Sequence, residues 1–173
     1  MGELVERVDE DDRVLGVVER AEAVREKWLH RIAVTICRDP EGRILVVRRA
    51  KKRSLFPGHY DVLVGGAVGV GESYGDAAAR ELAEELGLRV PLRFLFKFLC
   101  GQGVGPIWLA VYEATVSETL VPDAGESDWQ GWMTVADLRE VVDERCFVPC
   151  GREALLRYLE LGPGSGTCEP AAG

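Results

Sequence analysis

The segment GAVGVGESYGDAAARELAEELGL, from Gly66 to Leu88, decides the fold, because a glycine-rich stretch runs directly into an amphipathic helix. Ser73 is a suitable N-cap residue, and Gly87 is a suitable left-handed stop. The spacing therefore predicts a helix from about Tyr74 to Leu86.

The predicted helix crowds three acids together beside its buried face. At about 100° per residue, its apolar face consists of Ala78, Leu82 and Leu86. Glu81 and Glu85 border or enter this face, and Glu84 lies beside them, nearer to Arg80. One arginine cannot neutralise three carboxylates, but a hard divalent ion such as Mg²⁺ binds oxygen ligands of this kind. The alternative interpretation is an acidic helix face that is simply exposed to water.

The spacing of the fixed residues favours the first interpretation. Gly66, Glu72, Arg80-Glu81-Leu82, Glu84-Glu85 and Gly87-Leu88 match every fixed position of G-x5-E-x7-R-E-U-x-E-E-x-G-U, where U is aliphatic. This pattern is the Nudix box, and the chain resembles the Nudix hydrolase family from about residue 30 to 160. The segment FPGHYD, residues 56–61, is similar to the aromatic-Pro-Gly-x-aromatic segment of that family, and Trp132 occupies its late aromatic position.

The order of the other segments predicts an α+β fold. Strand-like runs occupy residues 32–37, 44–47, 60–64, 92–99 and 107–116, and a final helix is expected over 152–161. The spacing is that of hairpins rather than of regular βαβ units, which favours a mixed sheet covered by helices. The resemblance implies the Nudix fold, an α/β/α sandwich with a loop-helix-loop metal site.

We expect three parts along the chain. Residues 1–30 form an N-terminal extension with a β-hairpin made by residues 5–8 and 14–18. Residues 31–161 form the Nudix domain, and residues 162–173, rich in glycine and proline, form a disordered tail. The extension looks like that of isopentenyl-diphosphate isomerase and its hydrolase relatives.

The resemblance also implies roles for the acids of the box. Glu84 and Glu85 would be Mg²⁺ ligands, with Mn²⁺ as an alternative ion, and the carbonyl of Gly66 would complete the shell. Glu81 would be a ligand or the group that orients or deprotonates water. Glu72 and Arg80 would form the ion pair that fixes the box.

Residues outside the box add further candidates. A further acid is expected from the loop at 125–132, where Glu126 is preferred to Asp128, so the general base stays open among Glu81, Glu126 and Asp128. The cations that could bind phosphate are Arg48, Arg49, Lys51, Lys52 and Arg53.

The amino-acid composition limits the classes of partner that the protein can bind. The 173 residues carry 29 acidic and 21 basic side chains and a formal net charge of −8, which opposes binding to duplex nucleic acid. No signal peptide or membrane span is recognisable, so a cytoplasmic protein is expected. The five cysteines lack any Cys-x-x-Cys pair, and we expect free thiols rather than disulfides or a zinc site.

These observations predict a Mg²⁺-dependent hydrolase that cleaves the diphosphate linkage of a nucleoside diphosphate joined to another moiety. One alternative is an isopentenyl-diphosphate isomerase-like protein, but Gly65 and Ala67 stand where its cysteine and one histidine would be, and His30 lacks a partner histidine. The other is a noncatalytic nucleotide-sensing Nudix domain, which the intact acids disfavour. The particular small-molecule diphosphate stays open, and a homodimer is a common state for proteins of this size.

Overall fold

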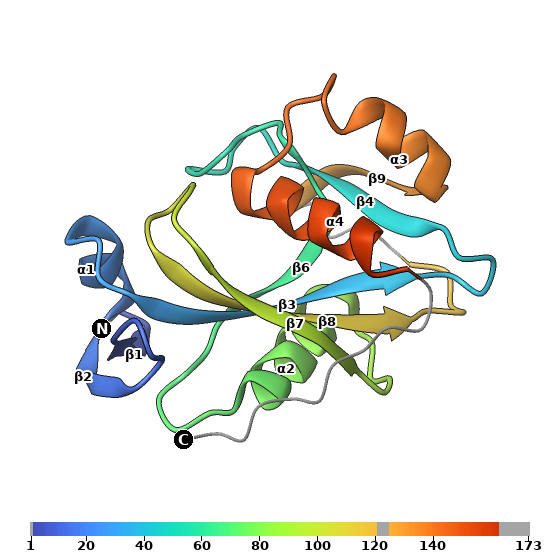
Figure 1. The fold of residues 1–173 in the computed structure, drawn as a ribbon. Coiled ribbons are helices and arrows are strands. Elements are labelled where there is room, and N and C mark those ends of the chain that lie inside the picture. The colour runs from blue at the N-terminus through green and yellow to red at the C-terminus, as the bar shows by residue number, and fades with distance from the viewer. Residues whose placement is uncertain (1, 121–124, 163–173) are drawn as a thin grey trace.

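A computed structural model describes residues 2–120 and 125–162 (Figure 1). Its centre is a mixed sheet with the spatial order β7 (Arg93–Cys100), β8 (Ile107–Thr115), β3 (His30–Arg38) and β6 (Leu63–Ala67). β3 and β8 run parallel, whereas the β7–β8 and β3–β6 pairs are antiparallel. The predicted mixed sheet and α+β class are confirmed.

A smaller antiparallel unit leans on this sheet. β4 (Ile44–Arg49) pairs with β9 (Ser127–Met133) on one side and with the short β5 (Tyr60–Asp61) on the other. Among the described residues, β4 pairs with β3 in the sheet only at Arg38 and Ile44. A cleft between the two units is lined by Val47 and Arg49 of β4, Asp61 of β5, and Leu63 and Val64 of β6.

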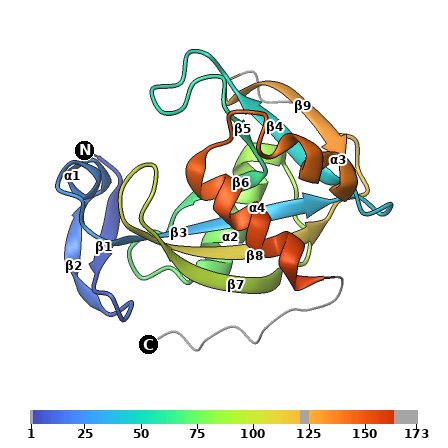
Figure 2. The same cartoon turned by 45° about the horizontal axis from the view of Figure 1, so that its top comes forward.

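Helices cover both faces of the central sheet (Figure 2). α2 (Tyr74–Leu86) packs on one face through small residues, with Ala77 and Ala78 against Ala33 and Ala110. α3 (Val135–Val141) and α4 (Pro149–Leu161) share the other core with large apolar residues of β3 and β8. Because successive β3 side chains point to opposite faces, the strand supplies both cores and the fold is an α/β/α sandwich.

The caps of α2 are those expected from its sequence. The Ser73 hydroxyl oxygen accepts a hydrogen bond from the Asp76 backbone N–H at 3.1 Å. Gly87 ends the helix with φ +69°, a conformation that glycine adopts without a steric penalty. These two residues fix which turns of the helix carry the acids of the box.

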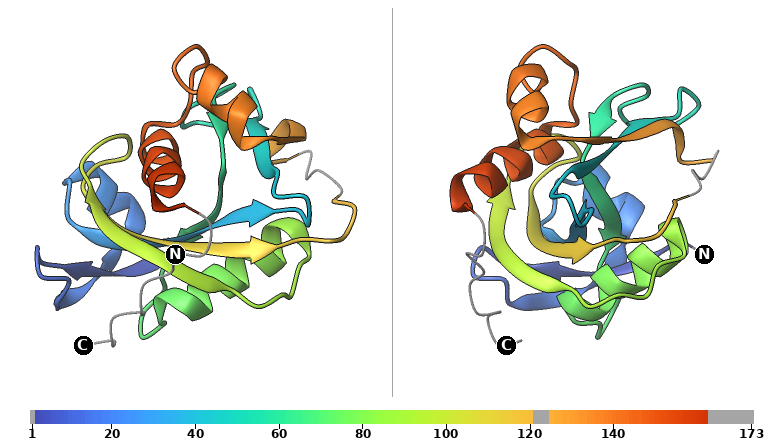
Figure 3. Two further views of the ribbon diagram at one scale, coloured as in Figure 1. Left: turned by 45° about the vertical axis from the view of Figure 1, so that its right-hand side comes forward. Right: turned by 90° about the vertical axis from the view of Figure 1, so that its right-hand side faces the viewer.

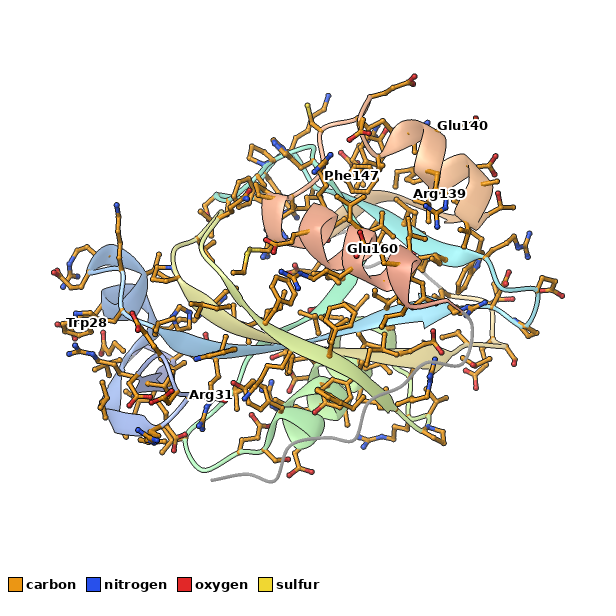
Figure 4. The ribbon with its side chains drawn as sticks, viewed as in Figure 1. Trp28, Arg31, Arg139, Glu140, Phe147 and Glu160 are labelled. Carbon is orange, nitrogen blue, oxygen red and sulfur yellow. A yellow bond between two sulfur atoms is a disulfide. The ribbon has the colours of Figure 1, made fainter. Side chains whose placement is uncertain are left out.

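The N-terminal extension is a hairpin of β1 (Leu4–Val8) and β2 (Val14–Glu19), followed by the short helix α1 (Arg20–Arg25). It lies at one end of the sheet, well away from α3 (Figure 3). Arg31, labelled in Figure 4, lies where the hairpin meets the sheet and pairs with Asp12 at 2.6 Å and Glu6 at 2.9 Å.

Several local expectations differ from the structure. β6 continues through Gly65 and Gly66, which the sequence placed in a loop, and residues 127–133 form β9 rather than a loop. α4 begins at Pro149, three residues before the expected start, because proline is well suited to the first helical turn. The predicted tail beyond Gly162 lies outside the described residues.

The expectation of free thiols was wrong for two cysteines. Cys100, at the end of β7, forms a disulfide with Cys150 in the first turn of α4, fifty positions later in the chain. Cys37 is buried and Cys146 is exposed, and both are free thiols. The pairing depends on how the sheet and α4 pack together, so no local cysteine spacing could have indicated it.

Candidate active site

The frame of the box is built around Arg80. Its guanidinium donates to both Glu72 carboxylate oxygens, from Nε at 2.9 Å and from Nη2 at 3.0 Å, and also to the Ala67 carbonyl oxygen at 3.0 Å. Glu72 accepts from the Gly69 backbone N–H at 2.8 Å. The hydrogen bond from Arg80 is the main cause of the lowered pKa of Glu72. Arg80 thus ties α2 to the segment that precedes it.

Glu81 lies directly against Gly66 of β6. A Cβ atom on Gly66 would be 2.7 Å from Glu81 Oε1, so any other residue here would displace this carboxylate from its present position. Arg80 Nη1 also donates to Glu81 Oε1 at 2.5 Å. The helical wheel had directed Arg80 toward Glu84, but its long side chain reaches Glu81 as well. The box therefore brings Gly66, Glu81 and Arg80 together.

Glu85 is the acid with the most perturbed ionisation. Burial raises its pKa to about 8, and the negative charges of Glu81, Glu126 and Asp61 add to this effect, while a backbone hydrogen bond from Gly65 opposes it. Three carboxylates, from α2, β5 and the turn before β9, thus act on the carboxyl group of Glu85. Such a cluster of acids with a strongly perturbed pKa is typical of functional sites.

The structure separates the other acids that the sequence singled out. Glu126 belongs to the cluster and pairs with Arg53 at 2.6 Å. Asp128 pairs instead with Arg48 at 2.6 Å and does not enter the cluster. Glu84 is 60% exposed, and its nearest ionic partner is Arg80 at 3.4 Å. Of the three box acids on α2, Glu84 is the most exposed and does not act on Glu85.

One residue of the site, Asp61, was missed by sequence reasoning, and Arg49 was only one of five candidate cations. Asp61 is buried at the end of the FPGHYD segment, and burial raises its pKa to about 6. Its Oδ1 accepts from the backbone N–H groups of Val62 and Leu63, and a Cβ on Gly151 would be only 2.2 Å from that oxygen. Arg49 lines the same space as Asp61 and Glu85. The signal for Asp61 in the sequence was its position at the end of the FPGHYD segment, which is similar to a segment of the Nudix family.

A cavity of about 180 Å³ opens beside the acids on the face of the sheet covered by α4. It is lined by acids of the cluster, by Arg49 and Arg53, and by apolar side chains of β3 and β8. Arg20 of the N-terminal extension also contributes to its wall. The cavity is thus polar where the carboxylates lie and apolar along the sheet.

The donor set is suited to a hard divalent cation. Within residues 2–120 and 125–162, no three His, Cys, Asp or Glu side chains already converge as a metal cage. However, the interacting groups are carboxylates, the ligand type that Mg²⁺ prefers, and burial, together with repulsion from the neighbouring acids, keeps a proton on Glu85 near neutral pH. A cation would remove that repulsion, so the residues present fit a magnesium-type ion.

Gly65, which stands where the isomerase has its cysteine, has no room for a side chain in this structure. Gly65 lies so close to β3 that a Cβ atom would be 2.2 Å from the Ala33 carbonyl oxygen. His30 is buried, and its Nδ1 lies 3.1 Å from the Trp28 carbonyl oxygen, the arrangement of a packed histidine. Both observations disfavour isomerase chemistry.

The structure has a mixed sheet between helices, and its site combines Gly66 on β6, the Arg80–Glu72 ion pair and the acids around Glu85. These features together are those of the Nudix class of proteins. The family model described as NUDIX domain matches residues 28–149, and the chain belongs to this family. An uncharacterized Nudix hydrolase of Streptomyces coelicolor is 44% identical over 170 residues, covering 94% of each chain. The chain is accordingly a Nudix hydrolase.

Two further relatives extend the comparison. A prenyl-diphosphate phosphatase of Methanosarcina mazei is 32% identical, and the match covers 92% of this chain and 96% of the relative's chain. The crystal structure of DR0079 from Deinococcus radiodurans is 29% identical, with a TM-score of 0.78, covering 90% of this chain and 98% of that one. No helix in the described residues is both long and apolar enough to cross a bilayer.

Proposed function

We propose that this protein is a Mg²⁺-dependent diphosphohydrolase that cleaves the diphosphate linkage of a small molecule, such as a nucleoside diphosphate joined to another moiety. The observation that carries the proposal is the half-buried Glu85, whose pKa is raised by burial and by neighbouring acids within reach of a cavity. A protein does not retain such a costly cluster for stability, because each charge would be more stable in water.

Glu81, Glu84, Glu85 and the Gly66 carbonyl would hold the cation, with Mn²⁺ as a second ion to test. When bound, the ion would neutralise the phosphoryl oxygens and activate water. Glu84 has the weakest support of these ligands, because it is largely exposed.

The chain's own residues have separate tasks. Arg80 and Glu72 hold the box in place, and Gly66 leaves the space that Glu81 needs. Glu81 would orient the attacking water or take its proton, and Glu126 is the second candidate for that task. Asp128 is a weaker candidate because it is engaged by Arg48.

Arginines beside the acids would bind the substrate phosphates. Arg49 and Arg53 line the same cavity as Glu85, and a guanidinium can donate two parallel hydrogen bonds to a phosphate. Arg53 is paired with Glu126, so binding of a phosphate would compete with that ion pair.

Prenyl diphosphates form a second candidate substrate class. A relative of this chain from M. mazei carries the name prenyl-diphosphate phosphatase. The cavity of the present chain has apolar walls along β3 and β8. Both classes share the bond that the proposed chemistry cleaves.

The test is hydrolysis of a substrate panel with Mg²⁺, with Mn²⁺ and with EDTA, in ¹⁸O-labelled water and with product identification. We expect turnover with either ion, none with EDTA, and incorporation of label into a phosphate product. Glu85→Gln should lower turnover by at least about 100-fold. Equal activity of wild type and Glu85→Gln would contradict the proposal.

A further inference from the structure

Phe56, in the loop between β4 and β5, has a backbone conformation that bulky residues avoid. Its φ is +50°, in the left-handed region, although the next residue is Pro57, which favours an extended conformation in the residue before it. Among the described residues, the other non-glycine residues with a positive φ are Asp12 and Lys27, which are both polar. Strained residues persist only where their surroundings hold them, and they cluster at functional sites. The aromatic side chain at this position is therefore a candidate for a functional role.

The turn that follows Phe56 holds it in this conformation. The Phe56 carbonyl oxygen accepts a hydrogen bond from the His59 N–H at 3.3 Å, and Gly58, with φ +72°, lies between them. The Gly58 N–H donates to the Arg49 carbonyl oxygen at 3.0 Å, and the Arg49 N–H donates to the His59 carbonyl oxygen at 2.9 Å. These backbone hydrogen bonds attach the turn to the end of β4, so the position of the Phe56 ring is fixed by the fold.

The ring of Phe56 lines the cavity beside Glu85. Its tip reaches the loop between β7 and β8, where a Cβ atom on Gly103 would be 3.5 Å from Phe56 Cζ. Gly103 lines the same cavity, and its φ of +82° is a conformation that glycine adopts without a steric penalty. The two loops therefore meet at the ring, which forms the cavity wall between them.

The ring lies next to the group that is proposed to bind phosphate. Arg49 Nε donates to the carbonyl oxygen of Leu55, the residue before Phe56, at 3.0 Å. A guanidinium has further donors on its two Nη atoms, and these suit a phosphate. Arg49, Glu85 and Phe56 all line one cavity. A diphosphate bound between Glu85 and Arg49 therefore presents the group attached to it to the Phe56 ring.

We infer that Phe56 is a specificity-determining residue, whose ring contacts the group joined to the diphosphate and favours substrates in which that group is large. This inference rests on the proposed function and goes beyond it, because it assigns recognition of the non-phosphate group to one side chain. The flat apolar face of a phenyl ring binds aliphatic and aromatic groups alike, since either contact removes apolar surface from water. A diphosphate that carries only a small group does not reach the ring.

The test compares substrates with a large and a small group on the diphosphate. Hexyl diphosphate and ADP-ribose carry large groups, and methyl diphosphate carries a small one. For whichever large substrate wild type hydrolyses faster, we expect Phe56→Ala to lower kcat/KM by about 10-fold or more, mainly through a higher KM. For methyl diphosphate we expect a change of less than about twofold. Equal losses for large and small substrates would overturn the inference, because a purely structural role affects both.

Three further variants separate the ring from its surroundings. Phe56→Tyr retains the ring and should retain the preference for the large substrate. Phe56→Gly removes the ring but suits a left-handed backbone, so it repeats the test of Phe56→Ala in a loop without strain. Leu99→Ala is the matched control, because Leu99 is 44% exposed and is not among the described residues that line the cavity. A loss of preference in Leu99→Ala as large as that in Phe56→Ala would contradict the assignment.

Failure of the inference can be distinguished from failure of the proposed function. If none of the three diphosphates is hydrolysed with Mg²⁺ or Mn²⁺, the proposed function is wrong, and calorimetric binding decides the inference. The probes are methylenediphosphonate and its hexyl and adenosine esters. Tighter binding of an ester than of methylenediphosphonate to wild type, with loss of this difference in Phe56→Ala, supports the contact. Equal affinity of wild type for all three probes, or an unchanged difference in Phe56→Ala, overturns it.

Discussion

Glu81 and Gly66 depend on each other at the scale of single residues. The carboxylate of Glu81 occupies the space that a Cβ on Gly66 would need, and Arg80 contacts Glu81 while holding Glu72. The glycine therefore has a steric role, and the arginine has a positioning role. Both roles predict a loss of activity in a protein that remains folded.

Gly66→Ala should lower turnover by about 10- to 100-fold, because the added methyl group displaces the Glu81 carboxylate. Only a side-chain end has to move, so we expect the melting temperature to change by only a few degrees. Steady-state kinetics and thermal unfolding check both parts. Full activity would show that the contact between Gly66 and Glu81 has no part in the reaction.

Arg80→Ala should lower kcat by about 100-fold and leave the protein folded, because Glu72 and Glu81 lose the group that holds them. Arg80→Lys retains the charge without the forked geometry, and we expect it to recover only part of the rate. An activity of Arg80→Ala equal to that of wild type would refute the positioning role.

Two connections between elements hold the outer parts of the fold on the sheet. Asp12, in the turn of the hairpin, accepts hydrogen bonds from Lys97 of β7, Arg31 of β3 and Tyr74 of α2. The disulfide between Cys100 and Cys150 ties β7 to α4. Neither connection involves the acids of the box, so both should affect stability more than chemistry.

Asp12→Asn should destabilise the fold by about 1–3 kcal/mol at pH 7, because it removes a charge from a nearly buried network. Burial alone would raise the pKa of Asp12, but the hydrogen bonds from Lys97, Arg31 and Tyr74 lower it below its ordinary value. A lowered pKa means that the stabilisation is fully present above the unfolded-state pKa of 3.8 and is lost as the pH falls through the lower folded-state value.

Urea unfolding at several pH values measures the free energy of unfolding of wild type and of Asp12→Asn. We expect the difference in the free energy of unfolding between wild type and Asp12→Asn to be constant near neutral pH and to shrink below about pH 4. Asp11→Asn is the matched control, since the Asp11 side chain is 68% exposed and should contribute less than about 0.5 kcal/mol. Equal effects of the two substitutions would contradict this account of the network.

Loss of the disulfide should lower the free energy of unfolding by about 2–4 kcal/mol, because the crosslink restricts the unfolded chain over a separation of 50 residues. Denaturant unfolding of Cys100→Ser and of wild type, with and without a dithiol reductant, checks this. Cys146→Ser is the control, since Cys146 is an exposed free thiol. A wild-type protein whose stability is insensitive to the reductant would contradict the prediction.

At the scale of the whole molecule, the parts predicted from sequence are those encoded by neighbouring residues. The helix at 74–86, its caps and the acids of the box follow from local spacing, and the structure shows this helix with both caps. Asp61 could not be assigned in this way, and Arg49 could not be singled out among five candidate cations, because their place beside Glu85 depends on how β4 and β5 pack against β6. The same limit applies to the pairing of Cys100 with Cys150.

The packing of distant segments also decides which acids meet. Glu126 and Asp128 are only two residues apart, yet Glu126 acts on Glu85 while Asp128 pairs with Arg48. Strand alternation would place residues two apart on the same face. The two acids are separated because Glu126 precedes β9, whereas Asp128 lies at a bulge between the Arg48–Trp129 and Arg49–Ser127 pairs. The sequence gives no sign of this bulge, so it left both acids as candidates.

The most direct test of the magnesium site is anomalous diffraction from crystals of the full chain grown with Mn²⁺, which reveals the ion independently of any activity. We predict an anomalous peak within about 2.0–2.3 Å of carboxylate oxygens of Glu81 and Glu85, and loss of the peak in crystals of Glu85→Gln. Wild-type crystals that contain Mn²⁺ but show no peak beside Glu81 and Glu85 would contradict the account.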